Sequence, residues 1–88
     1  MKENNITADT RLRLQEIDYN PDGKDLIDVL NYLYKEYKIV ITTHAYSDGK
    51  FAYIIKIDGW EKQIGARTDT PEAAINCGIR VACHEFIN

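Results

Sequence analysis

Residues 18–23 match a metal-binding loop in both residue type and spacing. They read Asp-Tyr-Asn-Pro-Asp-Gly. In an EF-hand loop, Asp18, Asn20 and Asp22 would stand at ligand positions 1, 3 and 5. Gly23 would then make the sharp turn required at position 6. The chemistry that this pattern suggests is coordination of calcium, a hard cation that takes oxygen ligands.

The residue that should close this loop does not fit calcium. Position 12 should supply a two-oxygen carboxylate and is Val29, while Asp28 lies one residue early and is rotated by about 100° if a helix has begun. We therefore predict no metal site and interpret the acidic residues as a turn at the amino end of a helix, where the dipole favours negative charge. The alternative is a calcium-binding module that uses Asp18, Asn20, Asp22 and Asp28.

The histidines and cysteines lack the spacing of a catalytic or zinc site. Cys77 and Cys83 point about 240° apart on a helix, which excludes a disulfide between them, and they form no C-x₂-C pair. His44 lies in the middle of an expected strand, whereas catalysis needs a cleft and an orienting partner. His84 complements the negative end of a helix dipole. We predict a protein that is not an enzyme and that has no catalytic residues and no cofactor.

Composition and charge exclude several classes of protein. A chain of 88 residues with 44% hydrophobic residues is one small globular domain, here taken as residues 1–88. Net charge is -3 and the basic residues are scattered, whereas nucleic-acid binders show a basic stripe. No run of eighteen apolar residues and no signal-like start occurs, so we expect no membrane contact and a cytoplasmic protein.

Two helices and three strands follow from the periodicity of the apolar residues. Residues 1–7 are polar and are expected to fray, and residues 8–18 form an extra helix or strand, with a helix favoured. Asn20-Pro21 is typical of a helix start, and helical spacing predicts a helix over residues 24–37. Thr70-Pro71 caps a second helix that runs to about Phe86.

Three runs rich in β-branched and aromatic residues predict strands: 38–46, 51–57 and 60–67. Short turns at Ser47–Gly49 and at Asp58-Gly59 join them into hairpins. The predicted fold class is therefore α+β, with order α-β-β-β-α. It is a three-stranded antiparallel meander with the helices packed on one face.

The hairpin register decides which side chains face outward, because a slip of one residue exchanges the faces. A two-residue loop would set Tyr46 opposite Phe51, and a three-residue loop would set it opposite Lys50. We prefer the three-residue loop because it separates polar from apolar side chains more cleanly. A two-residue turn at Asp58-Gly59 then sets Lys56 opposite Glu61. That turn also assigns three residues to the inner face: Trp60, Ile64 and Ala66.

The predicted outer face is mixed and carries aromatic, polar and apolar side chains. We expect it to contact a protein partner or a second copy of the chain. The candidate binding residues are Thr42, His44, Tyr46, Ile54, Lys56, Gln63 and Arg67.

Turn and cap motifs in the second half of the chain resemble a known family. The Asp-Gly-Lys-aromatic hairpin, the Asp-Gly-Trp turn and the Asp-Thr-Pro-Glu-Ala-Ala-Ile helix start look like those of small "ABA sandwich" proteins of phages and prophages. The same helix start is similar to the strand-to-helix junction of HicB-type antitoxins. The phage resemblance implies an α-β-β-β-α accessory protein without catalytic residues.

The functional expectation is a small non-enzymatic binding protein, phage-encoded and acting on a host protein through its exposed sheet face. Two alternatives are the calcium-binding module and an antitoxin-like protein that binds a toxin.

Overall fold

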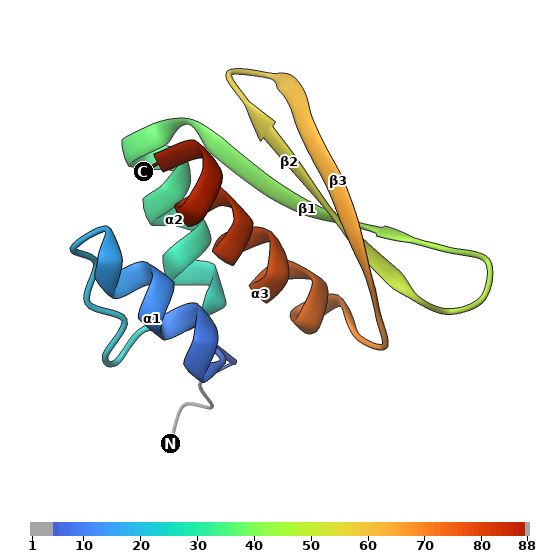
Figure 1. The fold of residues 1–88 in the computed structure, drawn as a ribbon, viewed down its shortest axis with the longest axis horizontal. Coiled ribbons are helices and arrows are strands. Elements are labelled where there is room, and N and C mark those ends of the chain that lie inside the picture. Colours follow the sequence, from blue (N-terminus) through green and yellow to red (C-terminus); the bar gives the residue numbers. More distant parts are fainter. Residues whose placement is uncertain (1–4, 88) are drawn as a thin grey trace.

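Three antiparallel strands in the order β1-β2-β3 form the sheet, and the helices pack on it (Figure 1). The computed structural model describes residues 5–87. Its elements are α1 (Ala8–Glu16), α2 (Leu26–Tyr37), β1 (Ile39–Ala45), β2 (Phe51–Ile57), β3 (Trp60–Thr68), α3 (Pro71–Val81) and a π-helical turn, η1 (Ala82–Ile87). This arrangement confirms the predicted α+β class and the three-stranded meander.

The helices form two layers on one side of the sheet. α3 lies against all three strands and α2 against β1, whereas α1 packs on α3 and η1 (Figure 1). The inner side chains Ile39, Ile41 and Ile55 are buried under the helices. On the opposite face, Thr42 and Lys56 are exposed. The sheet is therefore covered on one face only.

Residues 8–16 are helical, as favoured, because Thr7 caps this segment and Leu14 anchors it. The Thr7 hydroxyl accepts a hydrogen bond from the backbone of Thr10, and Leu14 is completely buried. Of the segment expected to fray, residues 1–4 lie outside the described part, and residues 5–7 are held by α3. The Asn76 side chain accepts from Thr7 N–H at 3.0 Å and donates to the Asn5 carbonyl at 2.9 Å.

The second helix begins at Leu26, so the prediction that Asn20 caps it is wrong. Its N-cap is Asp25, whose carboxylate accepts from Asp28 N–H at 3.0 Å, while the Asp28 carboxylate accepts from Asp25 N–H at 3.0 Å. Such a reciprocal capping box satisfies two backbone donors at once.

Asn20 has a more local role. Its side chain accepts from the backbone N–H of Asp22 at 3.0 Å, which fixes a turn rather than a helix start. Pro21 is buried next to it, and Gly23 has a φ of 74°, a left-handed conformation that interrupts a helix.

The first hairpin has the preferred register, with its three-residue loop. Tyr46 N–H donates to the Lys50 carbonyl at 2.8 Å, and Gly49 takes a φ of 83°. Ile41 therefore pairs with Ile55 on the inner face, and Thr42 with Ile54 on the outer face.

Two irregularities in β3 overturn part of the second register. Lys56 pairs with Glu61 as predicted, but Ile55 pairs with Gln63, so Lys62 is an extra residue on β3. Residues 63–65, between this bulge and the next irregularity, therefore lie on the opposite face from the one predicted. Ile64 pairs with Ile54 on the outer face, so its predicted inward orientation is wrong.

The second irregularity lies between Gly65 and Thr68. These residues pair with Tyr53 and Phe51, so three steps along β3 match two along β2. Ala66 takes a φ of 69° there, an uncommon conformation for a residue with a side chain. Both bulges fall on an edge strand, where such bulges are most frequent.

The last helix, α3, begins as predicted. It packs more closely on the sheet than a residue larger than glycine at position 78 would allow. Thr70 is its N-cap and accepts from Ala73 N–H at 3.1 Å. A Cβ at Gly78 would lie 2.8 Å from Cγ2 of Ile41 and 3.0 Å from Cβ of Tyr53. The regular helix ends at Val81, and η1 continues it to Ile87.

Candidate functional site

The uncovered face of the sheet holds six of the seven predicted binding residues. Thr42, His44 and Lys56 are exposed, and Ile54 is half-buried between them and β3. Among residues 5–87 no helix covers these side chains, because the helices described above pack on the inner face. The face can therefore contact another molecule without rearrangement of the core.

A cluster of rings and charges is ordered at one end of this face. The rings of His44 and Tyr46 meet edge to face with centroids 5.5 Å apart, and the guanidinium of Arg67 lies 4.4 Å from the Tyr46 ring centroid. Arg67 also forms an ion pair with Asp48. A stacked guanidinium and a packed ring lose little freedom on binding, which suits a contact surface.

Asp48 links this cluster to the hairpin loop. Its carboxylate accepts a hydrogen bond from Lys50 N–H at 3.1 Å. That backbone bond, together with the guanidinium of Arg67, lowers the pKa of Asp48 below its usual value. Lys50 pairs in turn with Asp69, which raises the pKa of the lysine. The charges at this end are thus paired with one another.

Gln63 is the predicted binding residue that the structure places elsewhere. Because of the bulge at Lys62, Gln63 lies on the inner face, and its amide donates to the hydroxyl of Tyr53 at 3.0 Å. The buried tyrosine hydroxyl needs a partner, and Gln63 supplies it. Ile64, 49% exposed, takes the outer position that had been assigned to Gln63.

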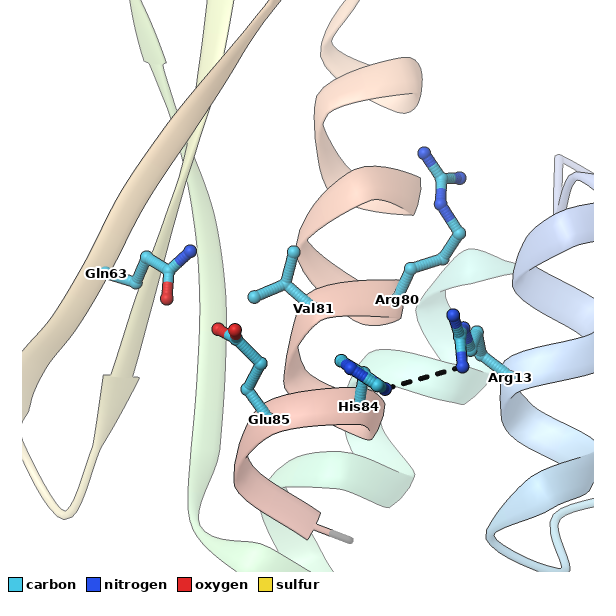
Figure 2. A pocket seen from close by; sticks show the side chains of 6 residues that line it. All are labelled: Arg13, Gln63, Arg80, Val81, His84 and Glu85. Atoms are coloured by element: carbon cyan, nitrogen blue, oxygen red, sulfur yellow. Dashed lines mark hydrogen bonds between the residues drawn. The ribbon is translucent and has the colours of Figure 1, made fainter.

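A small pocket lies between β3, α3, η1 and α1. It has a volume of about 220 Å³ and is lined by Arg13, Gln63, Arg80, Val81, His84 and Glu85. Figure 2 shows Val81 between Gln63 and Glu85 on one side and the basic side chains on the other. The volume is below the range of about 300 to 1,000 Å³ usual for ligand pockets.

The histidine of this pocket contacts a guanidinium. Nδ1 of His84 lies 3.5 Å from an Arg13 nitrogen, the dashed contact in Figure 2, and that nitrogen also donates to Glu16 at 3.1 Å. Because a guanidinium only donates, this contact favours an imidazole whose Nδ1 carries no proton. A catalytic histidine is usually oriented by a carboxylate instead.

Sequence reasoning missed this pocket, although one signal was present. Arg80 and His84 are four residues apart, so a helix places them on one face. Arg13 joins them only because α1 packs on α3, and that packing is not visible in the local pattern.

The acidic residues of the alternative calcium-binding interpretation do not gather into one group in the described part of the chain. Asp22 forms an ion pair with Arg11, and Asp28 bonds to the backbone of the α2 cap. Asp18 takes a φ of 64° at an exposed position after α1. Within residues 5–87, no group of three or more His, Cys, Asp or Glu side chains could hold a metal ion.

Searches for similar proteins found no match for this chain among protein-family models, curated proteins or solved structures. None of the helices within residues 5–87 combines the length and the apolar character that a membrane span requires. The observed order of helices and strands is compatible with the expected "ABA sandwich" arrangement.

Proposed function

We propose that this chain is a small, non-enzymatic binding protein that contacts a protein partner through the outer face of its sheet. The turn and cap motifs that look like those of small phage proteins support an accessory role, with the protein encoded by a phage and acting on a host protein in the cytoplasm. The partner is taken to be a protein because the face combines rings, apolar side chains and paired charges.

One observation carries the proposal: the outer face joins exposed apolar surface to an ordered aromatic cluster. Ile64 is 49% exposed beside the half-buried Ile54, and the cluster of His44, Tyr46 and Arg67 lies further along the same face. Aromatic and arginine side chains dominate the energy of protein interfaces.

The test replaces Thr42, His44 and Tyr46 together with alanine. The matched control replaces three exposed side chains on the helices: Leu12, Ile27 and Tyr34. Both variants and the unaltered protein are used to capture partners from host cells, and binding of each captured partner is then measured with purified components. Circular dichroism checks that each variant is folded.

We expect the sheet variant to bind at least about tenfold more weakly than the unaltered protein, because loss of one hot-spot side chain costs about 2 kcal/mol or more and tenfold needs only about 1.4 kcal/mol. The helix variant should bind normally. Retention of every partner by the sheet variant, with loss by the helix variant, would move the binding surface to the helices.

A further inference from the structure

The two edges of the sheet differ sharply, and only one of them can accept another strand. β3 contains two bulges and three charged residues, namely Glu61, Lys62 and Arg67. Bulges and charges of this kind block pairing between sheet edges. β1 pairs with β2 without a register shift, and its sequence, IVITTHA, has no proline, lysine, arginine or acidic residue.

The second half of β1 is exposed on both of its faces. Thr42 and His44 are exposed on the outer face, and Thr43 and Ala45 are exposed on the inner face. The cause is visible in Figure 1, where the β1–β2 hairpin extends beyond the helices. A strand approaching this edge would meet no helix over these four residues.

The hydrogen-bond pattern tells which backbone groups point away from β2. Tyr46 N–H bonds to the Lys50 carbonyl, so this pair is a hydrogen-bonded one. Since such pairs alternate with non-bonded pairs, Thr42 and His44 also bond to β2. The backbone groups of Thr43 and Ala45 therefore point outward, where no strand formed by the described residues lies.

We infer that β1 pairs antiparallel with β1 of a second copy of this chain, so that the two sheets join into one of six strands. The outward-pointing groups permit a two-fold axis at Thr43. Thr43 then faces Thr43 of the second copy, Ile41 faces Ala45, and Thr42 faces His44. Threonine pairs across strands are favourable, and no like charges meet.

A second copy fits this edge better than a charged peptide segment. β1 carries no charged side chain that could pair with the charges of a charged peptide. A second copy of β1 is equally uncharged, so it leaves no charge unpaired at this edge. One open edge and one blocked edge also give a closed dimer rather than a growing fibre, because each copy can pair only once.

This inference goes beyond the proposed function, since it concerns the edge of the sheet rather than its face. The two are nevertheless related in space. In the dimer, Thr42 and His44 of both copies lie next to one another, and the two outer faces form one continuous surface.

The first test measures the oligomeric state against concentration by analytical ultracentrifugation. We expect a dimer for the unaltered protein. Thr43→Lys places a charge opposite itself, so it should weaken the dimer by at least about 100-fold, since like charges placed together cost several kcal/mol. Ile64→Lys, which alters the outer face at the other edge, should leave the dimer intact.

Cross-linking gives a second readout that does not depend on the folding of the lysine variant. Residues facing each other in a hydrogen-bonded antiparallel pair have Cα atoms about 5.5 Å apart, which suits a disulfide. Thr43→Cys should therefore form a disulfide-linked dimer under mild oxidation. Lys62→Cys, in the bulge of β3, and the unaltered protein with Cys77 and Cys83 are the controls and should not.

Three results would overturn the inference: a monomer at all concentrations, cross-linking of the Lys62→Cys variant but not of Thr43→Cys, or dissociation by Ile64→Lys but not by Thr43→Lys. The last would place self-association on the outer face. Thr43 points to the inner side, so Thr43→Lys should still capture the partners of the outer face. If Thr43→Lys loses the dimer but keeps its partners, the two hypotheses are tested independently: the dimer reports on this inference, and partner binding reports on the proposed function.

Discussion

Gly78 is the residue that sets the distance between α3 and the sheet. Glycine in the middle of a helix is unfavourable by up to about 1 kcal/mol relative to alanine, so its presence needs a packing reason. The close approach of Ile41 and Tyr53 supplies that reason. A side chain at this position would meet a β-branched residue and a Cβ next to the backbone, and neither can move freely.

Gly78→Ala should therefore destabilise the protein by about 1 to 3 kcal/mol, the usual cost of overpacking, despite the better helix propensity of alanine. Urea unfolding followed by circular dichroism measures the change. Combining it with Ile41→Leu, which removes the methyl group nearest to the new Cβ, should recover part of the loss. A stabilised single variant would mean that α3 can shift outward at little cost.

At the scale of elements, the sequence predicted every strand, both long helices and the favoured helical form of the first segment. Periodicity and turn chemistry are local signals, and they suffice where the chain follows them. Thr70 and the three-residue loop at Ser47–Gly49 are examples, since each acts on its own backbone neighbours.

The strand β3 was predicted, but the faces assigned to some of its residues were wrong, because strict alternation was assumed along the whole strand. The bulge at Lys62 turns Gln63 toward Tyr53 of β2, whose hydroxyl requires a hydrogen-bond partner. Gly65 leaves room for the Tyr53 ring. Such a requirement arises from packing across strands, which no local pattern contains. Gln63 was therefore assigned to the outer face and Ile64 to the inner face by error, while the other six candidate residues lie on the predicted face.

The start of α2 gives a prediction at this scale, because sequence and structure disagree about its cap. Asp25→Ala should destabilise the protein by about 1 kcal/mol, as loss of an N-cap does. Asn20→Ala should cost less, since Asn20 holds only an exposed turn. Thermal unfolding of both variants measures the two losses of stability. A larger loss for Asn20→Ala than for Asp25→Ala would favour Asn20 as the N-cap, as inferred from the sequence.

On the scale of the whole molecule, α1 is an outer layer that contacts the rest of the chain through α3 and η1. Cys83 of η1 is completely buried. Burial raises the pKa of its thiol from 9.0 to about 11, with a smaller contribution from Glu16 of α1. The charged thiolate of Cys83 would have no contact with water in the folded protein, which disfavours it.

This shift predicts an alkaline limit to stability. The thiol stays protonated in the folded protein up to about pH 11, whereas in the unfolded chain it loses its proton from about pH 9. The stabilisation is therefore fully present below pH 9 and is lost as pH rises towards 11. Cys83→Ala should flatten the fall in unfolding free energy across this range. An equally steep fall in the variant would assign the effect to other groups.

Tyr53 is held between two glycines that are thirteen positions apart: its hydroxyl would lie 2.7 Å from a Cβ at Gly65, and its own Cβ would lie 3.0 Å from one at Gly78. Positions 53 and 65 should vary together during evolution. Distant relatives with a large ring at position 53 should keep a glycine at position 65, and relatives with a small residue there should be free to lose it. Gly78 should stay in both cases, because Cγ2 of Ile41 and the Cβ of residue 53 remain next to it. Such linked variation offers a signature for recognising kin too divergent for overall sequence comparison.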